Sequence, residues 1–241
     1  MLILTAAEFT SRLIALRSDE DLLKHQRYFR FDPIDQPRDD YFIGVRMGSI
    51  FKVAKEFIDM PVDEIEKLME SPIHEIRTGA MSVMGESAKS KRCSDERLAE
   101  LNDLYIRRHD RINNWDLIDL AAHYVVGRYL ADKPRDILYK LARSKNMWER
   151  RTAIVATAHF ILKMKQTDDT FAIAELLVND DEDLVHKGTG WMLRAAGDKE
   201  RKRLLAFLDK HAATMPRVLL RYSIEKLDKD QREHYLQLKK K

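Results

Sequence analysis

The chain has 241 residues, 44% hydrophobic and 34% charged, which is enough for one large domain or two small ones with a substantial core. Its formal net charge of +3 is too close to balance to indicate a nucleic-acid partner by itself. A single cysteine excludes an internal disulfide, and the scattered histidines give no zinc pattern. The start lacks a basic leader, and no apolar run approaches the roughly 20 residues of a membrane span. These features predict a cytoplasmic protein with no metal site and no membrane partner.

Only 8 Gly and 6 Pro are present, which favours many helices with short connections over a large sheet. Residues 1–30 predict two amphipathic helices. Their apolar stripes are Phe9, Leu13, Ile14 and Leu16 in the first, and Leu22, Leu23, Tyr28 and Phe29 in the second. Two prolines make residues 31–40 a loop. A helix then runs through Phe57, and another opens at Pro61 and continues to about Glu70.

Similar helix starts recur from residue 77 onward. They fall at Arg77, Arg151, Lys187 and Arg221, at intervals of 74, 36 and 34 residues, and half of the first interval points to Asn114. A period of this length, with helix pairs and no sheet, predicts an all-α fold: an α-solenoid of HEAT-like repeats whose stacked helix pairs form the core. Residues 1–241 are predicted to form one such domain with a concave DNA-binding face.

The four cations at these positions are predicted to lie near helix N-termini, where the helix dipole favours acids. Four repeated exceptions indicate an external anion, because a helix N-terminus with an adjacent arginine suits a phosphate. The alternative is that each cation pairs with the preceding helix. Basic residues interleaved with aromatics over residues 105–150 also suit a nucleic acid, although a solvated charged face has the same composition.

Residues 113–119, Asn-Asn-Trp-Asp-Leu-Ile-Asp, open the one predicted repeat helix that has no cation at its start. Trp115 and Asp119 are four residues apart, so on a helix they share one face. The simpler interpretation makes Asn114 an N-cap, Asp116 a first-turn acid and Trp115 a buried anchor.

The repeat positions of Trp191 and Arg151 would let them face the same surface as Trp115 and Asp119. Two indoles, one carboxylate and one arginine would then bracket a small space, although Trp191 could equally be a core residue. Indole faces attract cations by about 0.5–2 kcal/mol each. A cationic alkylated purine leaves its sugar as a neutral base, so a carboxylate that stabilises the oxocarbenium-like sugar and places a water suffices. We find no P-loop, dinucleotide fingerprint or Ser-His-Asp pattern that offers another chemistry.

At these residues the chain resembles the AlkD-like DNA alkylation repair glycosylases, which are built of HEAT-like repeats. The resemblance extends over about residues 25–235. Its strongest segments follow one another in the order 115–119, 148–153, 187–194 and 215–226.

The resemblance implies a DNA glycosylase that excises positively charged N3- and N7-alkylated purines from duplex DNA, without a cofactor and without base flipping. Asp119 would be the catalytic carboxylate, and Trp115 and Trp191 would form the aromatic cleft. Arg151 would bind phosphate, and Tyr28 would be the N-terminal aromatic residue of the cleft. The protein would be a monomer, associated with the nucleoid when bound to DNA. The alternative is a catalytically inactive DNA-binding or protein-interaction scaffold.

Overall fold

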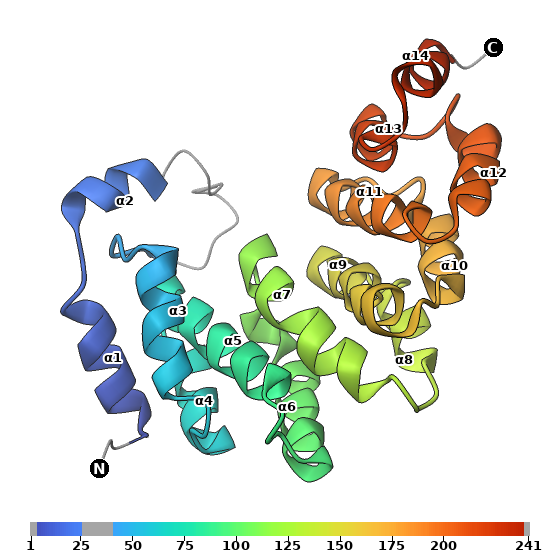
Figure 1. The fold of residues 1–241 in the computed structure, drawn as a ribbon. Coiled ribbons are helices and arrows are strands. Elements are labelled where there is room, and N and C mark those ends of the chain that lie inside the picture. Colours follow the sequence, from blue (N-terminus) through green and yellow to red (C-terminus); the bar gives the residue numbers. More distant parts are fainter. Residues whose placement is uncertain (1–3, 26–40, 239–241) are drawn as a thin grey trace. The chain divides into compact units, whose positions relative to one another are not determined.

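The computed structural model describes residues 4–25 and 41–238, and their regular secondary structure is helical. This confirms the predicted all-α class. The chain divides into two compact units, Met1–Ala121 and Ala122–Lys241, each built of packed helices (Figure 1). In the part of the chain that is described, no helix is long and apolar enough to cross a membrane.

The first unit is organised around its longest helix. It contains α1 (Ala6–Ile14), α2 (Asp19–His25), α3 (Met47–Glu56), α4 (Val62–Met69), α5 (His74–Lys89), α6 (Asp95–Arg107) and α7 (Trp115–Ala122). Helix α5 contacts α1, α3, α4 and α6, and 14 of its 16 residues are buried. It therefore forms the core of this unit, with α1, α3, α4 and α6 packed around it (Figure 1).

The predicted helices in residues 1–30 are confirmed up to His25 as α1 and α2. Phe9 and Leu13 of the predicted stripe are fully buried, but Ile14 and Leu16 are 38% and 45% exposed. Helix α1 ends at Ile14, so Leu16 lies beyond it and the helical periodicity no longer applies there. Leu23 is also exposed, at 65%, so the predicted stripes were too wide.

Helix α5 approaches α1 closely at Gly79. A Cβ atom added there would lie 2.4 Å from Cε1 of Phe9. The Phe9 ring is itself fully buried and packs edge-on against Phe57, with ring centroids 5.1 Å apart. Because the ring has no free space to move into, only glycine fits at position 79 without shifting the two helices.

We therefore expect Gly79→Ala to lower the free energy of unfolding by about 1–3 kcal/mol through overpacking. This loss outweighs the gain of up to about 1 kcal/mol that alanine brings to a helix. The matched control is Gly48→Ala in α3, where an added Cβ meets nothing within 4 Å, and this variant should be as stable as the parent or more so. Urea unfolding of both variants checks the prediction, and equal midpoints would contradict it.

The helices of the second unit form two layers, and successive helices belong to alternate layers. It contains π-helical turns at His123–Gly127 and Phe160–Met164 together with α8 (Asp136–Leu141), α9 (Met147–Ala156), α10 (Asp168–Leu177), α11 (Asp183–Gly197), α12 (Arg201–His211), α13 (Arg217–Ile224) and α14 (Lys229–Gln237). Helix α11 packs between α9 and α13, while α8, α10 and α12 pack against the α9 and α11 layer. Figure 1 shows this succession of helix pairs, which is the arrangement expected of HEAT-like repeats.

The predicted helix starts need a correction. The helices begin at His74, Met147, Asp183 and Arg217, three or four residues before the cations that were taken as their starts. Arg77, Arg151 and Lys187 therefore lie about one turn inside their helices, and Arg221 lies in the last turn of α13. Amide groups that deep in a helix bond to the preceding turn. The argument that these cations stand beside free N–H groups was therefore wrong.

Candidate functional site

Helix α7 carries Trp115 as its first residue and Asp119 one turn later. Asp116, Leu117 and Ile118 between them are buried, whereas Trp115 and Asp119 are partly exposed. Trp115 and Asp119, two of the predicted site residues, thus share the accessible side of α7. The backbone N–H of Trp115 donates to the side-chain Oδ1 of Asn114, at 2.9 Å. Asn114 therefore contributes to the start of the helix, as the simpler interpretation expected.

Asp116 is the first-turn acid of α7 that the simpler interpretation expected, but its carboxylate is buried. It is 2% exposed, and its Oδ2 lies 2.8 Å from Nε2 of His74 and 3.2 Å from Oγ1 of Thr78, both in α5. The partners are 42 and 38 residues away along the chain, so no local sequence signal reveals the contact. This buried cluster joins the start of α5 to the start of α7.

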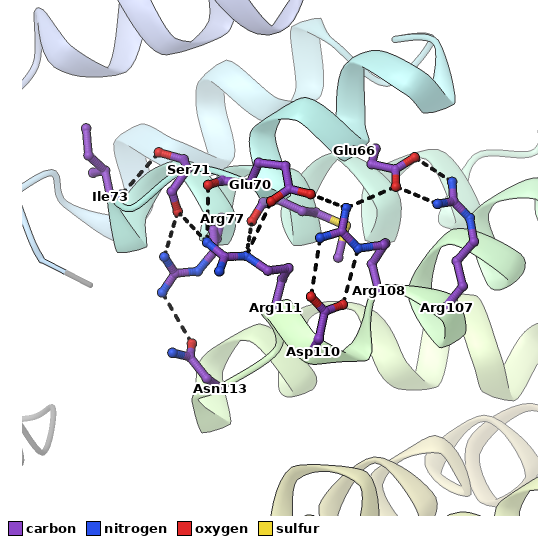
Figure 2. A network of polar contacts seen from close by, with 11 residues as sticks. Glu66, Glu70, Ser71, Ile73, Arg77, Arg107, Arg108, Asp110, Arg111 and Asn113 are labelled. Atoms are coloured by element: carbon purple, nitrogen blue, oxygen red, sulfur yellow. Dashed lines mark hydrogen bonds and ion pairs between the residues drawn. The ribbon is translucent and has the colours of Figure 1, made fainter. Parts of the chain in front are cut away.

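Arg77 is 2% exposed and is bonded within the first unit. Its Nη1 donates to the carbonyl oxygen of Ser71 at 2.8 Å, and its Nη2 donates to Oδ1 of Asn113 at 3.2 Å. Figure 2 shows the guanidinium between these two partners. Arg77 is therefore bonded internally, but to residues that lie just before α5 and α7 rather than to the preceding helix that the alternative named.

Several arginines of the predicted basic series belong to an ion-pair network in the first unit (Figure 2). Arg107 donates from Nη2 to Oε2 of Glu66 at 2.6 Å, and Arg108 donates from Nη1 to Oε1 of the same carboxylate at 3.0 Å. Hydrogen bonds from Arg107 lower the pKa of Glu66 to about 2. Arg108 also pairs with Asp110, and Arg111 donates to the Met69 carbonyl. These charges are largely compensated within the protein.

Arg151 in the second unit is 4% exposed, and its Nη1 donates to the carbonyl oxygen of Leu184. The guanidinium lies over Gly188 of α11, where an added Cβ would stand 3.2 Å from Nη1. At Gly190 an added Cβ would stand 2.5 Å from Cβ of Tyr222 on α13. The two glycines of α11 therefore mark close packing within the unit.

Lys187 and Trp191 are one turn apart on α11, and both are partly exposed. The Lys187 ammonium lies 2.7 Å from Oδ2 of Asp183, its i−4 neighbour. Arg221 on α13 is exposed, and the adjacent Tyr222 is 37% exposed. The second unit therefore offers accessible basic and aromatic side chains on α11 and α13.

The predicted site residues thus fall into two groups, each within its own unit: Trp115, Asp119 and Arg77 in the first, and Arg151, Lys187, Trp191 and Arg221 in the second. Tyr28 lies outside the described residues. Among the residues that are described, no three His, Cys, Asp or Glu side chains are grouped so that they could hold a metal. Sequence reasoning missed the His74–Asp116 contact and the internal bonding of Arg77 and Arg151.

Comparisons with known proteins give this geometry a context. The family model described as "DNA alkylation repair enzyme" matches residues 9–227. No curated protein matches the chain. A solved structure described as a predicted DNA alkylation repair enzyme from Enterococcus faecalis is similar, with 18% identity and a TM-score of 0.65 over 88% of this chain and 97% of that chain. At that identity the likeness shows a common fold, while the family model covers most of the sequence. The chain therefore belongs to the DNA alkylation repair enzyme family.

Proposed function

We propose that the protein is a DNA glycosylase that acts as a monomer on duplex DNA and hydrolyses the N-glycosidic bond of positively charged N3- and N7-alkylated purines without base flipping. The observation that carries the proposal is the accessible side of α7. There, an indole and a carboxylate stand one turn apart in a chain of a DNA alkylation repair family. This is the combination that a cationic substrate needs.

In the proposed reaction the bond between C1′ and the base nitrogen breaks, and its electron pair neutralises the cationic base. Because the base leaves neutral, no acid has to protonate it. Asp119 stabilises the positive charge that develops on the sugar and accepts a proton from the water that attacks C1′. Trp115 supplies an indole face to the cationic lesion and its sugar. Trp191, in the second unit, is proposed as a further aromatic contact with the DNA.

Of the four basic residues proposed to bind DNA, two are accessible and two are buried. Lys187 and Arg221 are accessible, so they are the proposed phosphate contacts. Arg77 and Arg151 are 2% and 4% exposed, so we propose that they act on DNA through the helices that they hold in place. The internal bonds of these two arginines also favour the second candidate function, a helical scaffold without glycosylase activity.

The deciding experiment incubates the protein with duplex DNA that contains 7-methylguanine or 3-methyladenine and measures the free base by chromatography. Release of the base, leaving an abasic site, is the expected result. DNA binding without release would instead identify an inactive DNA-binding protein. Neither binding nor release would identify a protein-interaction scaffold.

Removal of one exposed cation should change how DNA affinity depends on salt. We expect Arg221→Ala to weaken binding of any duplex sequence and to reduce the slope of log K against log salt by about 1, because one phosphate contact is lost. Arg232→Ala on α14 is the matched control, since Arg232 is also exposed but has no predicted role, and its slope should equal that of the parent. Fluorescence anisotropy titrations across salt concentrations measure both slopes, and an unchanged slope for Arg221→Ala would remove this residue from the DNA-binding surface.

A further inference from the structure

The first turn of α7 is held by polar side chains from the start of α5. His74 and Thr78 reach Asp116, at 2.8 Å and 3.2 Å, and Arg77 reaches Asn113 at 3.2 Å. Asn113 lies two residues before Trp115, the first residue of α7, and Asp116 lies directly after it. The position of α7 therefore depends on directional hydrogen bonds from α5 in addition to apolar packing.

The hydrogen bonds around His74 define its tautomer. Nη2 of Arg77 lies 3.4 Å from Nδ1 of His74, and an arginine nitrogen can only donate. Nδ1 is therefore the acceptor, and the imidazole carries its proton on Nε2, which donates to Asp116. The contacts thus run from the Arg77 guanidinium through the His74 imidazole to the Asp116 carboxylate.

His74 is also fixed from its other side. The ring of Phe42 stacks on the imidazole, with centroids 4.4 Å apart and an interplanar angle of 26°. The backbone of Tyr41 makes two hydrogen bonds at the start of α5. Its N–H donates to the Pro72 carbonyl at 3.0 Å, and its carbonyl accepts from the N–H of His74 at 2.9 Å. The imidazole is thus held in one orientation toward Asp116.

Joining α5 and α7 through buried polar side chains costs free energy. His74, Thr78 and Asp116 are at most 2% exposed, and Oδ1 of Asp116 is buried without a hydrogen-bond partner. Apolar side chains of similar volume often join helices equally well, whereas a polar cluster fixes one geometry. Asp116 follows Trp115 directly and precedes Asp119 by three residues, so the geometry that it fixes is that of the accessible side of α7.

We propose that His74 and Asp116 are a positioning pair that holds α7 so that Trp115 and Asp119 present a defined geometry to the substrate. This inference rests on the proposed glycosylase function. Neither residue of the pair touches the substrate, since both are buried. Their contribution is to keep the indole and the carboxylate from shifting relative to the reacting bond, and displacements of about 1 Å can cost on the order of 100-fold in rate.

The test uses the full chain with Asp116→Asn and His74→Leu, together with His74→Gln, whose amide can still donate to Asp116. Ser82→Ala is the control, because Ser82 is equally buried in α5 but bonds only to the Thr78 carbonyl. Three quantities are measured well below each variant's Tm: the single-turnover rate of base release, the DNA affinity, and amide hydrogen exchange over residues 115–118.

We expect Asp116→Asn and His74→Leu to lose about 10–100-fold in rate, because a displacement of up to about 1 Å can cost on the order of 100-fold, with DNA affinity unchanged. Exchange over residues 115–118 should become faster in both. His74→Gln should recover most of the rate, and Ser82→Ala should match the parent. A general loss of folding would instead lower affinity and rate together.

Unchanged exchange in Asp116→Asn and His74→Leu would overturn the inference whatever the activity. Faster exchange with a full rate of base release would also overturn it, since the pair would then hold α7 without serving the reaction. If the parent protein releases no base, the proposed function fails by itself. The exchange measurement then still decides whether this pair fixes the start of α7.

Discussion

Asp119→Asn should lower the rate of alkylated-base release by about 100-fold or more, the loss typical when a preorganised electrostatic group is removed from a transition state. Asparagine keeps the shape of the side chain but carries no negative charge. It can neither stabilise the oxocarbenium-like sugar nor accept the proton of the attacking water. The substitution lies on the partly exposed side of α7, so we expect the helix and the fold to remain intact.

Single-turnover release of 7-methylguanine measures this loss, and circular dichroism verifies the fold. DNA affinity should be retained or slightly increased, because a negative charge near the phosphates has been removed. The control is Asp103→Asn in α6, where the carboxylate pairs with Arg107 on the surface and its side chain is 74% exposed. An Asp119→Asn protein that keeps more than half of the parental rate would end the assignment of Asp119 as the catalytic carboxylate.

Glu75→Ala should cause the largest loss of stability that we predict, about 3 kcal/mol or more. The Glu75 side chain is buried and accepts hydrogen bonds from three consecutive backbone amides, those of Ile43, Gly44 and Val45, at 2.8–3.3 Å. Without the carboxylate these donors lose their partner, and each buried unsatisfied donor costs about 1–3 kcal/mol. The segment before α3 would then be released from α5.

Glu75→Gln is the informative comparison. Oε1 of Glu75 receives all three amides, whereas Oε2 receives only that of Ile43, at 3.1 Å. A glutamine oxygen in the place of Oε1 keeps the contacts to Gly44 and Val45, so its loss should be nearer to about 1 kcal/mol. Urea unfolding gives both free energies, and an equal loss for alanine and glutamine would show that the carboxylate's hydrogen bonds do not hold this segment.

The sequence predicted the helical architecture well because periodicity and start signals are local. The helix expected from Val62 to about Glu70 is found as α4, Val62–Met69, and the segment around Trp115 does open a helix. The helix starts assigned to Arg77 and Arg151 were wrong by one turn. True start signals, such as the Asn146 cap of α9, stand several residues earlier.

Less of the candidate site than of the fold could be predicted from the sequence. Four-residue spacing placed Trp115 and Asp119 on one side of a helix, and the exposure of both agrees with that arrangement. The contacts of Arg77 with Asn113, of Arg151 with Leu184 and of Asp116 with His74 could not be predicted, because each joins residues more than 30 positions apart. A list of charged residues gives no indication of which ones are already compensated within the fold.

The packing of Arg151 against Gly188 limits which residues position 188 can hold. The guanidinium reaches the Leu184 carbonyl by lying across the bare backbone of Gly188, where even a methyl group would stand 3.2 Å from Nη1. A larger residue at 188 would displace the arginine, whereas loss of the arginine would remove the constraint on 188. The constraint therefore runs in one direction: position 188 can take a side chain only once the arginine has moved or been replaced, whereas Arg151 can be replaced while Gly188 stays.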